Sequence, residues 1–320
     1  MRRISSVTSL TFAGLLSVAG LAACGDDGNS SGTDAGIDAA ELANPGFPVP
    51  TAVTKANNEV GGQWMEVGDA DWSCLNTPSA DQASTQAIAL SGKIRDFQNS
   101  SNGVGTATIT AFPGNTLSGN LGMGTSAADA ANKGNFTMNL AMLPAGQKRF
   151  GFKIDAPTYL RTYLLNQYFN PANATQTRDI SAVSIGTANA VIAFVGEQFD
   201  TSTGTLAGAF RDCQGNEVSN AVATVSSVSG TPTHLPGANS FYFGRTTGLP
   251  ARHNVEPVMS QNGLFVVIDL PPQAAPAFIQ IWGFKNAADL AAGNLSLLSE
   301  LASPVEANAI ITGSFEPKRM

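Results

Sequence analysis

A short pattern occurs twice in this 320-residue chain, and the second copy begins 116 residues after the first. The segment LSGKIRDFQ at 90–98 matches LAGAFRDCQ at 206–214, and a turn follows each of them. Next come the segments 104–112 and 218–225, which both begin with Val-x-x-Ala. Similarity at a fixed offset indicates one structural unit present in tandem. The fold is therefore expected to consist of two similar units in series.

Both copies continue with a Gly-x-Phe segment, in which Gly134 and Gly263 hold corresponding places. Residues 135–140 alternate between polar and apolar, which predicts a half-buried antiparallel strand. Residues 264–268 are apolar throughout, which predicts a strand covered on both faces. Each glycine stands where a hairpin needs positive φ, which glycine adopts at little cost.

The composition favours strands over helices. Charged residues make up 13% of the chain, about half of the usual ~25%. There are 33 glycines and 17 prolines, and Ser, Thr and Asn replace Lys and Glu as polar residues. Exposed helix faces rely on Lys, Glu and Arg, whereas this mixture suits short strands joined by turns. We therefore predict a mostly β fold made of two tandem antiparallel β-sandwich domains.

The order of these segments resembles the carboxypeptidase regulatory-like domain: a strand ending in Arg-Asp, a tight turn, a Val-x-x-Ala strand, a long loop, a Gly-x-Phe strand and a Leu-Pro turn. The resemblance covers about residues 85–170 and 204–285, and the loop at 113–133 is longer than the family pattern. It implies a transthyretin-like sandwich of the carbohydrate-binding-like grouping and says almost nothing about activity. The tandem layout and the preceding Trp72-Ser-Cys74-Leu are similar to lipoproteins of myxobacteria.

Three segments complete the expected elements. Residues 184–195 have apolar side chains at helical spacing, with Ser184 as a candidate N-cap and Gly196 as a stop. Residues 286–301 are a second helical candidate, which Gly293 interrupts, and 308–315 is expected to be a final strand. The fold thus has one or two short connecting helices.

The first residues predict export and a lipid anchor. Arg2 and Arg3 precede an uncharged stretch at 10–23 that is too short to span a bilayer and is typical of a secretory signal. Leu21-Ala22-Ala23-Cys24 resembles the lipobox of bacterial lipoproteins, which implies that Cys24 is lipidated after cleavage before it. Gly25, not Asp, follows the cysteine, which favours the outer membrane over the inner one. The alternative is an ordinary signal peptide with an incidental cysteine.

The predicted organisation divides the chain into a signal peptide, a tether and two folded units. A polar run after Cys24 cannot bury a core and acts as a tether. The segments are a signal peptide at 1–23, the lipidated cysteine and tether at 24–50, a leading segment at 51–84, a first sandwich at 85–183, a helical connector at 184–203, and a second sandwich with a C-terminal helix and strand at 204–320.

Two cysteines remain after lipidation, Cys74 and Cys213. An even pair in an oxidising compartment favours a disulfide between them. The alternative is two buried free thiols. A bond would tie the leading segment to the turn after the first strand of the second sandwich.

The sequence offers little for catalysis, a cofactor or a metal. Only two histidines exist, His234 and His253, and neither Gly-x-Ser-x-Gly nor Ser-x-x-Lys nor His-Glu-x-x-His is present. His253 and Glu256 could offer two metal ligands, but a surface histidine is the simpler interpretation. Tyr163 and Tyr242 are candidates for stacking on a sugar ring, with burial in the core as the alternative.

These features predict a non-enzymatic, lipid-anchored envelope protein that acts as a binding or structural module. Its expected partners are membrane lipid, through Cys24, and an envelope glycan or protein. The net charge of −7 opposes nucleic-acid binding. Two alternatives stay open: a carbohydrate or peptidoglycan binder that uses Tyr163 or Tyr242, and an envelope hydrolase that uses His253 and Glu256.

Overall fold

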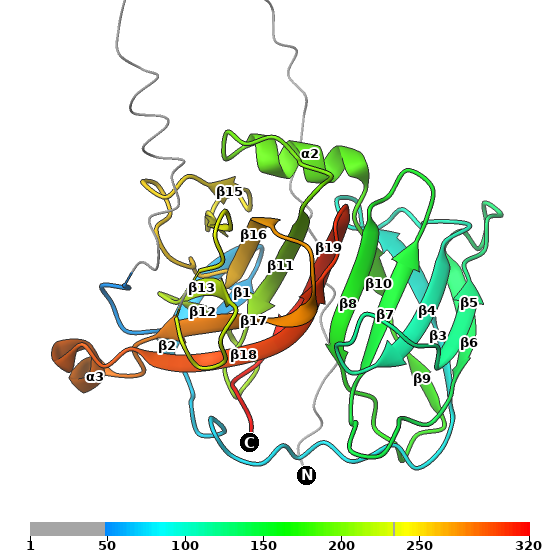
Figure 1. Cartoon of the computed structure of the whole chain (residues 1–320), viewed down its shortest axis with the longest axis horizontal. Helices are drawn as coiled ribbons and strands as arrows, with labels where there is room; N and C mark the ends of the chain where they lie inside the picture. Colours follow the sequence, from blue (N-terminus) through cyan, green and yellow to red (C-terminus); the bar gives the residue numbers. More distant parts are fainter. Residues whose placement is uncertain (1–48, 233) are drawn as a thin grey trace, which may run out of the picture.

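Each copy of the repeat forms its own set of strands in the computed structural model, which describes residues 49–232 and 234–320 (Figure 1). The first copy contains β3 (Ile88–Asp96), β4 (Thr108–Pro113), β5 (Gly122–Thr125), β6 (Asn135–Leu140), β7 (Phe150–Asp155), β8 (Arg161–Gln167), β9 (Thr175–Thr177) and β10 (Ile180–Ala182). The second contains β11 (Gly204–Phe210), β12 (Glu217–Ser219), β13 (Val222–Ser226), β14 (Asn239–Phe243), β15 (Pro250–Ala251), β16 (Leu264–Leu270), β17 (Gln273–Gly283), β18 (Ser296–Val305) and β19 (Ala309–Phe315).

The repeat predicted from the sequence is confirmed down to strand register. β3 pairs antiparallel with β6 and β11 with β16, so that Gly92 lies opposite Phe136 and Gly208 opposite Phe265. Both predicted hairpin glycines have positive φ, 89° at Gly134 and 63° at Gly263. Each glycine carbonyl accepts a hydrogen bond from the preceding long strand, at 2.8 and 2.9 Å. A glycine with positive φ and a hydrogen-bonded carbonyl therefore sets the register in both copies.

One nine-stranded sheet runs through both sandwiches, in the order β15-β14-β16-β11-β19-β8-β7-β4-β5. The final strand β19, predicted at 308–315, lies between β11 of the second copy and β8 of the first and is parallel to both. The sheets are therefore mixed and not purely antiparallel as expected. The two sandwiches share one continuous hydrogen-bonded layer.

Two smaller sheets cover opposite faces of the large one. Sheet β10-β3-β6, which β9 joins through β3, packs on β4 and β7, and sheet β13-β17-β18 packs on β11, β16 and β19. Along β8, Tyr163 and Leu165 belong to the core of the second sandwich, whereas Leu164 packs against the first. Successive residues of a strand point to opposite faces, so the two cores lie on opposite sides of the shared sheet.

Helix α2 (Ile185–Ala193) lies over the junction between the sandwiches (Figure 1). Its N-cap is Ser184, whose side chain accepts a hydrogen bond from Thr187 at 3.1 Å, as predicted. The helix packs on Val266 and Ile268 of β16, while the alternate residues of β16 enter the second core. This confirms that β16 is covered on both faces.

The second predicted helix is mostly wrong. Helix α3 (Ala287–Ala292) occupies the first part of 286–301, but Gly293 ends it in the left-handed conformation with φ of 69°. Residues 296–305 instead form β18 and pair with β17 over its whole length. Apolar positions that fit a helical spacing also fit a strand, and the partner strand decides between them. In the described part of the chain, no helix has the length and apolar character to cross a bilayer.

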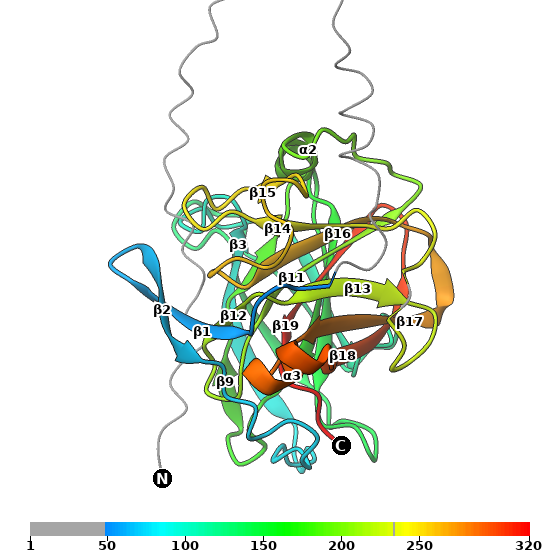
Figure 2. The ribbon, with the colours of Figure 1, turned by 90° about the vertical axis from the view of Figure 1, so that its left-hand side faces the viewer.

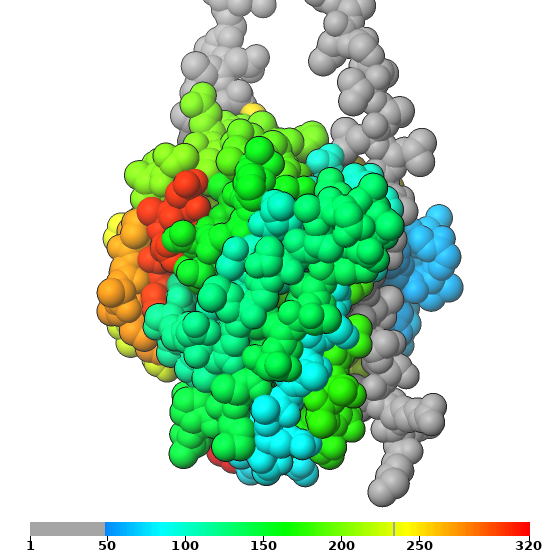
Figure 3. Space-filling view, turned by 90° about the vertical axis from the view of Figure 1, so that its right-hand side faces the viewer, coloured from blue at the N-terminus to red at the C-terminus, as the bar shows by residue number. Residues whose placement is uncertain are grey.

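The leading segment contains a hairpin that the sequence analysis did not predict. β1 (Lys55–Val60) and β2 (Gln63–Asp69) are joined by Gly61 and Gly62, both with positive φ, as a two-residue hairpin loop requires. β1 pairs with β12, which gives a third small sheet in the order β12-β1-β2. The hairpin projects beyond the rest of the molecule in two opposite views (Figure 2, Figure 3).

Gly92 is expected to tolerate no side chain, because a Cβ there would overlap the backbone carbonyl of Arg178. We expect Gly92→Ala to lower the free energy of unfolding by about 3 kcal/mol, measured by urea titration. The matched control is Gly186→Ala in α2, where a Cβ meets nothing closer than 3.9 Å. That change should be neutral or stabilising by about 0.5 kcal/mol. Equal effects of the two substitutions would contradict this account of Gly92.

Candidate functional site

Cys74 and Cys213 form a disulfide, with a Cα–Cα distance of 5.7 Å, as the sequence predicts. The bond joins the leading segment to the turn between β11 and β12. Trp72, two residues earlier, stacks on Phe210 with ring centroids 5.8 Å apart. The segment that directly follows the predicted tether is therefore fixed to the second sandwich.

The repeated Arg-Asp pair has a structural role in both copies. Asp96 accepts backbone hydrogen bonds from the two turn residues Gln98 and Asn99, and the buried Asp212 accepts from three backbone N–H groups. The preceding arginine pairs with a carboxylate in each copy, at 2.7 and 3.0 Å. These contacts stabilise the turn, and we assign the motif no catalytic role.

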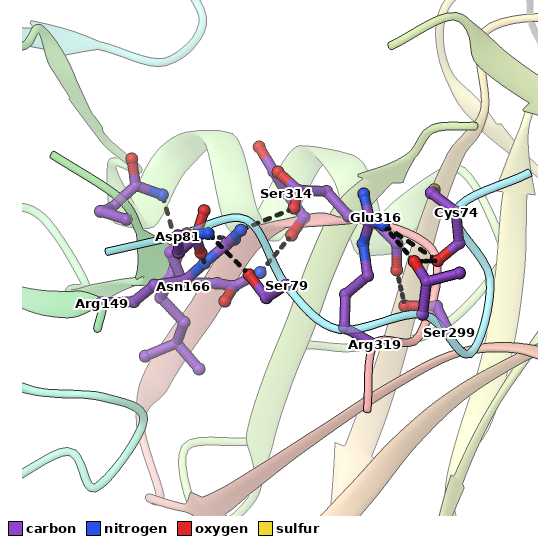
Figure 4. A network of polar contacts seen from close by, with 12 residues as sticks. Cys74, Ser79, Asp81, Arg149, Asn166, Ser299, Ser314, Glu316 and Arg319 are labelled. Carbon is purple, nitrogen blue, oxygen red and sulfur yellow. Dashed lines mark hydrogen bonds and ion pairs between the residues drawn. The ribbon is translucent and has the colours of Figure 1, made fainter. Parts of the chain in front are cut away.

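The C-terminal residues form a polar network with the leading segment and the first sandwich (Figure 4). Arg149 of the first sandwich pairs with Asp81 at 2.6 Å and with Glu316 at 2.9 Å. Burial alone would lower the pKa of Arg149, but the two carboxylates raise it above its ordinary value. Arg319 donates a hydrogen bond to the carbonyl of Cys74 at 2.9 Å. The C-terminal residues therefore contact the first sandwich through Arg149 and the disulfide residue Cys74 through Arg319.

Tyr163 and Tyr242, the candidates for sugar stacking, are 2% and 1% exposed. The hydroxyl of Tyr163 donates to the carboxylate of Glu306, and the hydroxyl of Tyr242 accepts from the N–H of Ala223 at 3.0 Å. Burial raises the pKa of both phenols. Neither ring offers a face to a ligand, so of the two interpretations left open for these tyrosines, the structure shows burial in the core and not a stacking platform. Their role is in the core, where Tyr163 also packs edge-to-face on Phe112.

Each of the two histidines contacts a neighbouring side chain. His253 stacks on Phe241 with ring centroids 4.9 Å apart, and its Nε2 is buried without a hydrogen-bond partner. His234 Nδ1 lies 2.8 Å from the hydroxyl of Thr224. Burial raises the pKa of Glu256, which lies with His253 in the loop between β15 and β16. In residues 49–232 and 234–320, no three His, Cys, Asp or Glu residues are grouped to hold a metal ion. Cys24 and its lipobox lie outside the described residues.

Two concave regions occur away from these residues. An apolar cavity of about 50 Å³ lies between α2 and the shared sheet and is lined by Leu160, Ile192 and Ile310 among others. A groove of about 400 Å³ lies over β3 and β6, with Ser91, Thr137 and Asn139 in its lining.

Three exposed large apolar side chains lie on the β1–β2 hairpin. Val60 is 58% exposed, and Met65 and Val67 are each 53% exposed. The sheet order leaves β2 as an edge strand. Sequence reasoning missed this surface, although Gly61-Gly62 between two short β-prone runs is a recognisable hairpin signal.

Comparisons with known proteins add no function. No family model matches the chain, and no curated protein matches it. Among solved structures, it is similar to 3-chlorocatechol 1,2-dioxygenase from Rhodococcus opacus, with 11% identity and a TM-score of 0.20. The match covers 47% of this chain and 78% of that chain. At that TM-score, the likeness carries no argument about this protein.

Reduction of the disulfide should destabilise the protein. The bond closes a separation of 139 residues, so the chain-entropy model gives at most about 5 kcal/mol, and about 2–4 kcal/mol is typical. We expect a Cys74→Ala/Cys213→Ala variant and the wild type in reductant to lose the same free energy of unfolding in urea titrations. Two thiols reacting in denatured, unreduced wild-type protein would contradict the bond.

His253 should make the fold sensitive to mild acid. Burial lowers the pKa of His253 below its ordinary value, so the folded state favours the neutral ring. The stability that depends on the neutral ring is complete above about pH 6.5 and declines as the pH falls through that value. Between about pH 7.5 and 5.5, His253→Phe should therefore lose less free energy of unfolding than the wild type. A His234→Gln control should keep the slope that His253→Phe removes, and equal slopes in His253→Phe and the wild type would refute the assignment.

Proposed function

We propose that this protein is exported, anchored to the envelope through a lipid on Cys24, and acts as a non-catalytic binding module that presents the β1–β2 hairpin to a partner. The observation that carries the proposal is the attachment of the leading segment. Directly after the predicted tether, the chain forms the exposed hairpin and then the disulfide to Cys213. The proposed anchor and the hairpin are thus both attached to the second sandwich near the Cys74–Cys213 disulfide.

Two features support an envelope location. The lipobox residues 21–24 follow an uncharged stretch and precede a polar run, as in lipoproteins. A disulfide persists in oxidising compartments and is rare in the cytosol. We infer the outer membrane from Gly25.

The body formed by the two sandwiches is suited to present a binding surface because both sandwiches share one continuous sheet. β19 pairs along its length with a strand of each sandwich, so relative motion of the sandwiches would break hydrogen bonds on one side or the other. A surface fixed to such a body keeps its orientation relative to both sandwiches. The carbohydrate alternative loses the aromatic residues on which it depended, since Tyr163 and Tyr242 are buried.

The anchor is tested by Cys24→Ser, which removes the thiol that would carry the lipid. We expect the variant to move from the membrane fraction to the soluble fraction and to lose labelling by radioactive palmitate. The control is Ser31→Ala in the same polar run, which should stay in the membrane fraction. Unchanged membrane partitioning of Cys24→Ser would overturn the proposed anchor.

A further inference from the structure

The outer edge of β2 has unpaired backbone groups. Val60 and Gln63 close the two-glycine loop and lie opposite each other. Residues of such a closing pair direct their N–H and C=O groups at each other, and alternate residues direct theirs away. Trp64 and Glu66 therefore turn their backbone groups outward, and among the described residues no backbone hydrogen bond reaches them from another element. An edge of this kind is a template for one more strand.

The two faces of the hairpin differ in chemistry. Directly opposed residues share a face, so Glu59 and Trp64 lie on one face, and Glu66 is next to Trp64 along β2 on that same face. The other face carries Val60 and Met65, which are both more than half exposed. A strand added to β2 would place alternate side chains beside the acidic face and beside the apolar face.

The acidic residues of the hairpin favour a partner with cationic side chains. Between 55 and 69 there is one basic residue, Lys55, against Glu59, Glu66 and Asp69. Lys55 lies 2.7 Å from Asp69 and 3.8 Å from Glu66, so Glu59 has no ion pair among the described residues. A second copy of β2 would bring these acidic residues together and is disfavoured. Cationic side chains would meet carboxylates and the ring of Trp64, which also attracts cations.

We propose that β2 binds an extended segment of a partner protein in which basic and apolar residues alternate, by adding it as a further strand. This rests on the proposed binding role and names the class of partner. The basic residues lie beside Trp64 and Glu66 of β2, with Glu59 one strand further on the same face, and the apolar residues lie beside Met65 and Val67 of β2. The backbone groups of Trp64 and Glu66 supply hydrogen bonds that do not depend on the partner's sequence.

The probe is a fluorescent synthetic peptide of about seven residues that alternates Lys and Val, long enough to span β2. It is titrated onto the purified full-length protein in mild detergent and followed by fluorescence polarisation. Two control peptides are an alternating Glu-Val peptide and a peptide of the same Lys and Val content with the lysines in one block. We expect saturable binding of the alternating Lys-Val peptide alone, weakened at on the order of 0.5 M salt. Equal binding of either control would overturn the proposal.

Three variants distinguish the contribution of charge to peptide binding from that of the backbone hydrogen bonds at the strand edge. Glu59→Gln/Glu66→Gln should weaken binding about fivefold, as the loss of two exposed ion pairs implies. Glu66→Pro removes an outward N–H at an edge where proline is tolerated, and should abolish binding. Glu197→Gln, a carboxylate away from the hairpin, should bind as the wild type does. Wild-type affinity of the double variant, or of Glu66→Pro, would overturn the proposal.

Hydrogen exchange gives a readout that non-specific charge attraction would not move. With the Lys-Val peptide bound, the amides of Trp64 and Glu66 should exchange more slowly, while those of β18 stay unchanged. Binding without this protection, or protection that grows with protein concentration when no peptide is present and so reports β2 pairing with a second copy, would overturn the proposal. Cys24 plays no part in these measurements, so failure here is distinct from failure of the lipid anchor.

Discussion

The pairing of β19 with β11 on one side and with β8 on the other is the contact on which the rest of the structure depends. Both pairings are parallel and run over most of the strand. They join strands β15-β14-β16-β11 of the second sandwich and strands β8-β7-β4-β5 of the first into one sheet. Tyr163 on β8 thereby enters the core of the second sandwich. The C-terminal residues that follow β19 then reach Arg149 and Cys74. Without this strand, the two repeats would have separate sheets.

The two copies of the repeat also differ in the contacts that they make with segments outside the repeat. The turn after Asp212 carries Cys213 and receives the leading segment, whereas Asp96 accepts a hydrogen bond from the hydroxyl of Tyr159 in its own sandwich. The second copy is thus tied to the residues nearest the anchor, and the first copy to the C-terminal network. This asymmetry leaves the β1–β2 hairpin attached by one strand pair, with its outer edge free.

The local elements were predictable where short-range physics decides them. Ser184 caps α2, Gly134 and Gly263 adopt positive φ, and the repeat has matching registers in both copies. Residues 286–301 were not, because a strand from elsewhere in the chain pairs with 296–305. Of the candidate site, only the disulfide was predicted. The tyrosines were ambiguous, since exposure depends on which sheet packs over β8 and β14, and the edge of β2 depends on which strand ends the β12-β1-β2 sheet.

The amino-acid sequence by itself determined the tandem β-sandwiches, the turns and the cysteine pair, because periodicity, glycine conformation and cysteine number act over short distances or by simple counting. Only the tertiary structure decided that the sandwiches share a sheet, that Tyr163 and Tyr242 are buried and that β2 has a free edge. The physical reason is that strand pairing is satisfied between residues far apart in the chain, and one strand has many partners compatible with its pattern.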